Sequence, residues 1–426
     1  MNNENIKEIY SPVSGDRYYK INHSSGLTIF VYPKPGYSST YAIFGTKYGS
    51  INNCFSVDGG EKITVPHGIA HYLEHKLFES EDGDAFTRYA KTGANANAYT
   101  SFDKTCYLFS CSEKLDENLE ILLDFVQSPY FTEQTVLKEQ GIIGQEIRMY
   151  DDNPQWRVMF NLLEAMYHNH PVKVDIAGTV ESIAEITPKL LYDCYNAFYD
   201  LNNMALCVCG NVTVEQVLSV ADRTLKKTEN RNVKSYFEQE PYEILKPYVE
   251  QEFPVSVELF NLGFKNKPKE TACAMNDAVS DILLYLLASP TSSLYRKLMD
   301  SNLINQSFAY EYFDGPGFDS VIFSGESRSP KEAAEMIKQY IKQIKQNGIE
   351  KEEFEIAKKA VYGDTIASLN SVDSIANEII DCTFAGSELF EYIECLSKAT
   401  VEDAERLLCE ILDVNNCALS VIKAKS

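Results

Sequence analysis

The chain has 426 residues, and its 39 Lys and Arg residues are outnumbered by 62 Asp and Glu residues, which gives a net charge of −23. This length exceeds what one hydrophobic core usually supports, so we expect two domains. The negative charge argues against nucleic acid and anionic membrane surfaces as partners, because both would repel the protein.

The N-terminal residues lack the basic start and apolar core of a secretory signal, and no apolar run is long enough to span a bilayer. We therefore expect a cytoplasmic protein without a membrane partner. Its eleven cysteines are scattered without C-x-x-C pairs, which favours free thiols over disulfides.

In the first half of the chain, short runs rich in strand formers alternate with longer runs of helical period. The predicted strands are 27–32, 41–48, 105–110 and 204–209, and the predicted helices are 115–127, 133–150 and 188–199, the last of them capped by Thr187.

The sequence HYLEH at residues 71–75 is predicted to lie on a helix. With about 3.6 residues per turn, His71, Glu74 and His75 can face one point, and two imidazoles at this spacing suit Zn²⁺. His67 lies one turn earlier, at the predicted start of the helix, where we expect a cap or contact with solvent.

A catalytic zinc site usually has three protein ligands and leaves its fourth position to water, so a third ligand must come from elsewhere. The predicted helix 133–150 carries Glu139 and Glu146 two turns apart on one stripe, and either could reach the metal.

Of the other histidines, His168 and His170 lie in a polar connection, where we expect them to meet solvent.

An H-x-x-E-H motif followed about seventy residues later by this glutamate pair resembles the inverzincins, the family of pitrilysin, insulin-degrading enzyme and mitochondrial processing peptidase. The likeness is closest to the small bacterial peptidase-like members. It implies one Zn²⁺ per chain with His71, His75 and Glu146 as ligands. In the catalytic group that it implies, Glu74 activates a zinc-bound water and Glu139 supports the ligands.

The order of elements repeats after a polar, charged stretch, which indicates an internal duplication. We predict a zinc-binding domain over 1–230, a linker over 231–246 and a substrate-contacting domain over 247–426. Within the second copy, the sequence predicts a strand at 255–264, helices at 276–288 and 293–301, a hairpin over 307–325, and helices from 331 and 350.

In the second copy, the predicted helix 276–288 corresponds to the helix that carries His71 and His75, but it contains no His, so the second copy cannot hold the metal.

Each half is predicted to be an α/β (α+β) sandwich, with a mainly antiparallel sheet and helices on one face. The resemblance implies that these two homologous domains have the LuxS/metallopeptidase-like fold.

The run 94–100 combines small residues with strand formers, as an edge strand that adds a peptide strand would need. An ordinary strand packed under a helix is the alternative. The resemblance places Asn97 and Ala98, followed by Tyr99, in contact with substrate.

In members of the family, the second domain supplies an Arg and a Tyr that steady the substrate. In this chain Met299 stands at the position of the Arg, so we expect Arg296, one turn earlier, to replace it. Tyr310 or Tyr312 is expected to be the tyrosine.

These observations favour a zinc metalloendopeptidase that hydrolyses peptides or unfolded polypeptides. The alternative is a non-catalytic assembly or maturation factor of the same fold. Glu74 argues for the enzyme, because a structural zinc site has no use for an uncoordinated general base. The resemblance implies a homodimer, or a heterodimer with a related peptidase-like chain.

Overall fold

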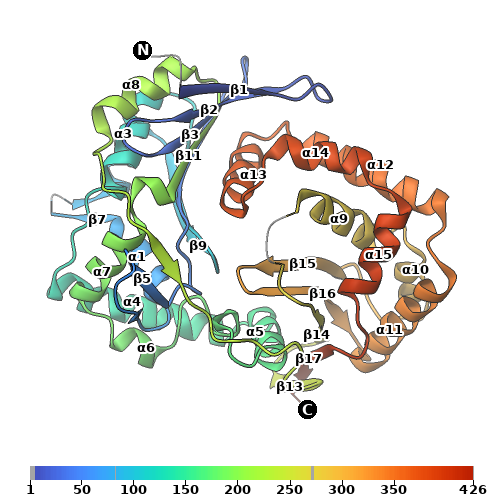
Figure 1. Cartoon of the computed structure of the whole chain (residues 1–426). Coiled ribbons are helices and arrows are strands. Elements are labelled where there is room, and N and C mark those ends of the chain that lie inside the picture. The colour runs from blue at the N-terminus through green and yellow to red at the C-terminus, as the bar shows by residue number, and fades with distance from the viewer. Residues whose placement is uncertain (1–4, 82, 270–272, 426) are drawn as a thin grey trace. The chain divides into compact units, whose positions relative to one another are not determined.

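The computed structural model describes residues 5–81, 83–269 and 273–425, which form two compact units (Figure 1). Unit 1 contains the described residues up to 147, together with 175–236 and 366–390. Unit 2 contains 148–174, 237–365 and the described residues from 391 onward. The predicted domain boundary at 231–246 stays a prediction, because compact units are defined by contacts and domains by independent folding.

Unit 1 is built on a seven-stranded sheet with the order β1-β2-β3-β11-β4-β10-β9. Its strands are β1 (Ile6–Tyr10), β2 (Arg17–Asn22), β3 (Thr28–Pro33), β4 (Thr40–Thr46), β9 (Asn95–Thr100), β10 (Thr105–Cys111) and β11 (Met204–Gly210). Strands β3 and β11 pair in parallel, and all other neighbours in this sheet are antiparallel. The prediction of a mainly antiparallel sheet is therefore confirmed.

Two small sheets and several helices surround this sheet. The small sheets contain β5 (Cys54–Val57), β6 (Ile63–Thr64) and β12 (Val233–Ser235), and β7 (Glu79–Ser80) with β8 (Gly83–Asp84). The helices are α1 (Ile69–Leu77), α2 (Ala85–Thr92), α3 (Leu115–Val126), most of α4 (Glu133–Asp151), α6 (Val180–Ala184), α7 (Pro188–Phe198), α8 (Val214–Thr224) and α13 (Val372–Ala385).

Local sequence explains where these helices begin. Helix α7 starts at Pro188, whose missing N–H is not needed in a first turn. The preceding Thr187 caps the helix, since its side chain accepts a hydrogen bond from the backbone N–H of Leu190 at 3.3 Å. The predicted start of this helix and its predicted Thr cap are thus confirmed.

Unit 2 is built on a five-stranded sheet with the order β13-β17-β14-β16-β15. Its strands are β13 (Tyr248–Phe253), β14 (Glu258–Lys265), β15 (Ala309–Gly315), β16 (Phe318–Ser327) and β17 (Cys417–Ala424). Its helices are α5 (Pro154–Met166), α9 (Ala274–Ala288), α10 (Ser293–Asp300), α11 (Pro330–Asn347), most of α12 (Lys351–Ser368), most of α14 (Leu389–Lys398) and α15 (Val401–Ile411).

The two sheets share one topology. In chain order, β3, β4, β9, β10 and β11 correspond to the five strands of unit 2. Both sets place the fifth strand beside the first in parallel, and the second, fourth and third strands follow antiparallel. This shared order agrees with the duplication that the sequence predicts.

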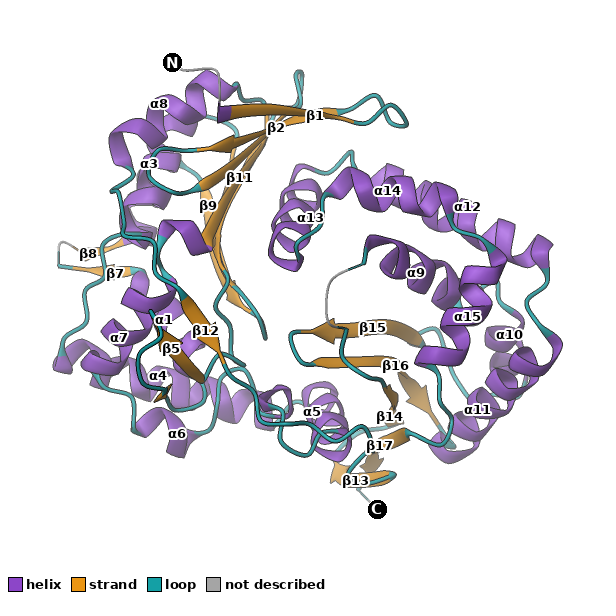
Figure 2. Ribbon diagram, viewed as in Figure 1, coloured by secondary structure: helices purple, strands orange, loops and turns teal. Residues whose placement is uncertain are grey.

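Helices cover both faces of the unit 1 sheet, and not one face as predicted. Successive side chains of a strand point to opposite faces. In β4, Gly45 faces α13, since a Cβ there would lie 3.3 Å from Ile380, whereas the Thr46 hydroxyl donates to the carbonyl of Phe198 in α7. Figures 1 and 2 show α13 on one side of the sheet and α3 and α8 on the other.

Helices α5 and α13 are exchanged between the two halves of the chain. Helix α13 comes from the second half and packs on β4 and β11 of unit 1. Helix α5 comes from the first half and packs on β14 and β17 of unit 2, where a Cβ on Gly263 would meet Met166. Each half of the chain therefore covers one sheet face of the other half.

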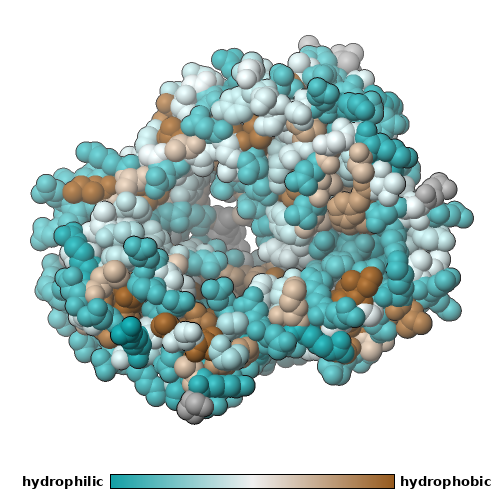
Figure 3. Space-filling model, turned by 180° about the vertical axis from the view of Figure 1, so that it is seen from behind, coloured by the Kyte–Doolittle hydropathy of each residue, from teal (hydrophilic) through white to brown (hydrophobic). Residues whose placement is uncertain are grey.

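Hydrophilic side chains dominate the face drawn in Figure 3, and hydrophobic ones are scattered among them. This surface agrees with the 24% of charged residues in the sequence. Among the helices that the structure describes, none is both long and apolar enough to cross a bilayer.

Candidate metal centre

A close crossing of two backbone segments holds the start of α1. Gly68 and Gly178 both have positive φ, 86° and 74°. A Cβ on Gly68 would lie 2.3 Å from the carbonyl oxygen of Ala177, and one on Gly178 would lie 2.6 Å from that of His67. Ser182 adds a hydrogen bond of 2.9 Å from its hydroxyl to His67 O. Only glycine allows this approach without strain.

Two side chains of the HYLEHK stretch join α1 to α4. The Tyr72 hydroxyl donates to the carbonyl oxygen of Val136. The fully buried Lys76 forms an ion pair with Glu79, and its ammonium lies 3.4 Å from Thr135 O. Sequence reasoning missed both residues, because the motif alone does not indicate which helix lies against α1.

His71, His75 and Glu146 converge on one point. One side-chain donor atom of each lies within 4.8 Å of the others. The carboxylate oxygens of Glu146 lie 3.7 Å from His71 Nε2 and 3.4 Å from His75 Nε2, which is too long for good hydrogen bonds. Two ligands held about 2.1 Å from one tetrahedral ion lie roughly 3.4 Å apart. The spacing therefore fits a shared zinc ion.

The protonation of the two histidines differs. Burial, together with the neighbouring His75, lowers the pKa of His71 to about 4, so its ring is neutral and can act as a ligand. Burial alone would lower the pKa of His75 too, but Glu139, Glu74 and Glu146 raise it above its ordinary value. Binding of a metal ion would compete with that proton.

Glu139 lies behind His75. Its Oε1 atom is 3.0 Å from His75 Nδ1, and the residue is only 7% exposed. With Nδ1 donating to this carboxylate, the lone pair of Nε2 is free to face Glu146. Glu139 is therefore placed to orient a ligand and not to be one.

Glu74 is a buried carboxylate beside this group. It is 8% exposed, and its Oε2 accepts a hydrogen bond of 2.9 Å from the hydroxyl of Thr100 in β9. Burial raises its pKa although His75 and Thr100 act in the opposite sense. The site thus combines three convergent donors with a carboxylate that is suited to proton transfer.

The three predicted substrate residues of β9 lie on a strand at the end of the sheet order, as an edge strand requires. Asn97 is exposed, and its Oδ1 accepts the N–H of Ala98 at 2.9 Å. The Tyr99 hydroxyl donates to Asn377 of α13 at 3.2 Å, so its side chain faces that helix.

Arg296 and Tyr310 belong to unit 2, whereas the metal group belongs to unit 1. Arg296 is exposed on α10 and donates to the carbonyl of Thr291 at 2.7 Å. Tyr310 on β15 packs against the core of unit 2, and burial raises its pKa to about 12. Their contact with substrate stays a prediction.

The expectation that His170 meets solvent is wrong. The residue is fully buried in unit 2, where its Nε2 donates to Pro316 O at 3.0 Å and its Nδ1 accepts the N–H of Val172 at 3.2 Å. Burial lowers its pKa to about 4, so the ring is neutral. A polar sequence context did not reveal this packing.

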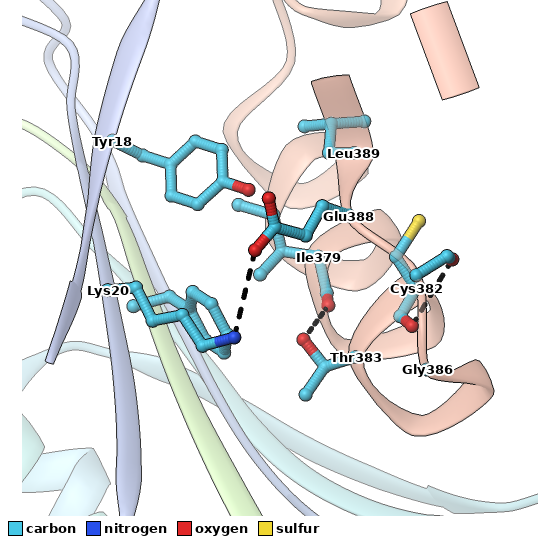
Figure 4. A pocket seen from close by; sticks show the side chains of 10 residues that line it. Tyr18, Lys20, Ile379, Cys382, Thr383, Gly386, Glu388 and Leu389 are labelled. Atoms are coloured by element: carbon cyan, nitrogen blue, oxygen red, sulfur yellow. Dashed lines mark hydrogen bonds and ion pairs between the residues drawn. The ribbon is translucent and has the colours of Figure 1, made fainter. Parts of the chain in front are cut away.

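A cavity of about 200 Å³ lies elsewhere in unit 1, between β2, β3 and the end of α13 (Figure 4). Lys20 and Glu388 line it and form an ion pair at 3.8 Å, and the Thr383 hydroxyl donates to Ile379 O. No predicted site residue lines this cavity, so we do not assign the metal centre to it.

Comparisons with known proteins agree with the motif. Residues 63–180 match the family described as Insulinase (Peptidase family M16), and residues 185–361 match the Peptidase M16 inactive domain. The "Uncharacterized zinc protease YmfH" of Bacillus subtilis (strain 168) is 40% identical over 430 residues, which cover 99% of this chain and 100% of that protein.

Comparison with solved structures agrees with the sequence comparison. The crystal structure of a "putative M16-like peptidase from Alicyclobacillus acidocaldarius" has a TM-score of 0.93 and 32% identity, with 99% of both chains covered. A chain of complex III2 from Candida albicans has a TM-score of 0.75 over 98% of this chain and 95% of its own length. At 12% identity, that second likeness shows the fold alone.

Proposed function

Because the chain belongs to peptidase family M16, we propose that it is a zinc-dependent endopeptidase acting on peptides or unfolded polypeptides. The observation that carries the proposal is the buried carboxylate of Glu74, which is not part of the group of His71, His75 and Glu146 that could hold a metal ion. A site that only stabilised the fold would not need such a base.

His71, His75 and Glu146 would hold the zinc ion, and Glu139 would orient His75. When bound, a zinc ion lowers the pKa of water and polarises a carbonyl group. The neutral His71 ring and the hydrogen-bonded His75 supply imidazole nitrogen donors, which suit zinc, and Glu146 supplies an oxygen donor.

Glu74 would act as general base and then as general acid. Its Oε2 is engaged by Thr100, so Oε1 remains to accept a proton from the attacking water. The water oxygen forms a bond to the scissile carbonyl carbon. Glu74 then returns the proton to the amide nitrogen as the C–N bond breaks, which yields an amine and a carboxylic acid that keeps the second proton of the water.

The substrate would extend along β9. An edge strand offers unpaired backbone groups to a peptide, and β9 is the last strand in the sheet order, with β10 as its neighbour on one side. Such addition requires an extended chain, which supports short or unfolded substrates. A folded protein would not meet this requirement.

The experiment compares cleavage of a quenched-fluorescent peptide pool by the full chain, by Glu74→Gln, and by Glu117→Gln as a control. Glu117 is an exposed glutamate on α3 of unit 1. We expect the parent and the control to cleave, a chelator to stop them, and added Zn²⁺ to restore cleavage. We expect Glu74→Gln to bind zinc but to lose at least 100-fold in rate.

The competing function is a non-catalytic assembly or maturation factor of the same fold. The observation that supports this alternative is the similarity of the fold to that of a chain of complex III2. A parent that binds stoichiometric zinc but cleaves no peptide in the pool would favour this function over the peptidase. Cleavage that survives both the chelator and Glu74→Gln would refute the zinc mechanism.

A second copy of the chain or a related peptidase-like chain is the proposed partner. Light scattering of the purified protein distinguishes a homodimer from a monomer. If the monomer is inactive, addition of a related chain that restores cleavage supports a heterodimer.

A further inference from the structure

The hydroxyl of Thr100 is the one hydrogen-bond donor that the described residues offer to the carboxylate of Glu74. Its Oγ1 lies 2.9 Å from Glu74 Oε2, and Oε1 receives no hydrogen bond from the described part of the chain. The hydrogen bond to Oε2 fixes the orientation of the carboxylate and therefore the direction in which Oε1 points. A fixed orientation suits a group that must accept a proton and return it.

The position of Thr100 in the sheet explains why its hydroxyl faces the site. Thr46, Thr105 and Thr100 are directly opposite one another on β4, β10 and β9. They form one row on the face that carries α1 and α7. The hydroxyls of Thr46 and Thr105 donate to the backbone carbonyls of Phe198 and Tyr48, at 2.7 and 2.8 Å. In this row, Thr100 alone donates to a carboxylate.

The same strand is the edge to which the substrate is proposed to add. Asn97 and Ala98 lie within this strand, and Thr100 lies two positions after Ala98, so the side chains of Ala98 and Thr100 point to the same face. Tyr99 points to the opposite face and is held by Asn377 of α13. Strand β9 is therefore held from both faces at the point where it meets Glu74.

We propose that Thr100 is a positioning residue that aims Glu74 through the hydrogen bond to Oε2, so that Oε1 faces the water to be deprotonated. This inference rests on the proposed peptidase function. Thr100 touches neither the substrate carbonyl nor the metal ligands in this role. It acts on the turnover step through Glu74 and not on the binding of zinc.

Thr100→Val tests this role, because valine keeps the β-branched shape of threonine but has no hydroxyl. We expect kcat to fall about 10- to 100-fold, as for other residues that orient a reacting group, with KM and zinc content unchanged. Thr100→Ser, which keeps a hydroxyl, should restore most of the parent rate.

Thr105→Val is the matched control. Thr105 is opposite Thr100 and is fully buried, but its hydroxyl bonds a backbone carbonyl. We expect this variant to lower the melting temperature and to leave kcat of the folded fraction unchanged. Equal losses of kcat in both valine variants would show a general effect on the sheet and would overturn the inference. So would a Thr100→Val variant with the parent kcat.

A parent that shows no peptidase activity, either alone or with a related peptidase-like chain added, would refute the proposed function, and the role of Thr100 would then be decided by crystallography. Structures of the zinc-loaded parent and of Thr100→Val should differ in the direction of the Glu74 carboxylate. The same Glu74 rotamer in both would overturn the inference, whatever the activity of the parent.

Discussion

The Nδ1 atom of His75 lies 3.0 Å from Oε1 of Glu139, while its Nε2 atom lies 3.4 Å from Oε2 of Glu146. One imidazole thus contacts both glutamates of α4 through different nitrogens. The two glutamates are two turns apart on the same helix, yet one is placed to orient the ring and the other to share a metal ion with it.

This difference predicts distinct effects on zinc binding. Glu146→Gln removes a charged oxygen ligand and should abolish stoichiometric zinc, as measured by atomic absorption after dialysis. Glu139→Gln leaves all three ligands and should weaken zinc affinity about 10- to 100-fold. Glu133→Gln, at the exposed start of α4, is the control. Full zinc occupancy in Glu146→Gln would contradict the ligand assignment.

The crossing of Gly68 and Gly178 predicts that a methyl group is not tolerated there. Gly178→Ala must adopt a positive φ and places its Cβ 2.6 Å from His67 O, so we expect a loss of more than about 3 kcal/mol. Gly36 also has a positive φ, 89°, but has open space around it.

Gly36→Ala should therefore cost only about 1–2 kcal/mol. Urea unfolding measures both variants. If the two glycines respond equally, the backbone contact at the start of α1 is not what requires Gly178. Because that contact positions α1, Gly178→Ala should also lower zinc content, whereas Gly36→Ala should leave it unchanged.

Glu240 predicts a pH dependence of the stability of unit 2. Its carboxylate accepts hydrogen bonds from the Lys265 ammonium at 2.6 Å and from the backbone N–H groups of residues 168, 169 and 170, at 2.7 to 2.8 Å. Burial opposes ionisation, but Lys265 and the three N–H groups outweigh it and lower the pKa to about 2.

A carboxylate with a lowered pKa stabilises the folded protein above its unfolded pKa of about 4.3, and this contribution is lost as pH falls from there toward 2. Glu240→Gln should lower the free energy of unfolding at pH 7 by about 3 kcal/mol, since it leaves Lys265 buried without its counter-ion. The difference from the parent should shrink between pH 5 and pH 2.

Glu238→Gln, an exposed neighbour, should show the parent behaviour at every pH. His170 adds a second pH dependence. That histidine is neutral when folded and destabilises the protein as pH falls below about 6.5, in the parent and in Glu238→Gln alike. A constant difference between the parent and Glu240→Gln from pH 7 to pH 2 would contradict the role of Glu240.

Much of the local structure was predictable. The period of apolar residues and the Thr187 cap predicted α7, and the runs of strand formers predicted β4, β10 and β11 within two residues at each end. Strands β1, β2, β13 and β17 and helices α13, α14 and α15 were not identified. Several of these are short or lie at sheet edges, where alternation is weak.

In the site, the motif indicated His71, His75 and Glu74, because spacing along one helix determines which side chains share a face. The residues alone left Glu139 and Glu146 as alternatives. Their different partners appear only when α4 packs on α1, through Tyr72 and Lys76.

By itself, therefore, the sequence determined several of the helices and strands, the local geometry of the H-x-x-E-H turn, the duplication and the absence of histidine from α9. Only the tertiary structure decided that α5 and α13 are exchanged, that β9 is an edge, and that Thr100 meets Glu74. These are contacts between residues far apart in the chain. They depend on how elements pack, and no local pattern of residues encodes a packing partner.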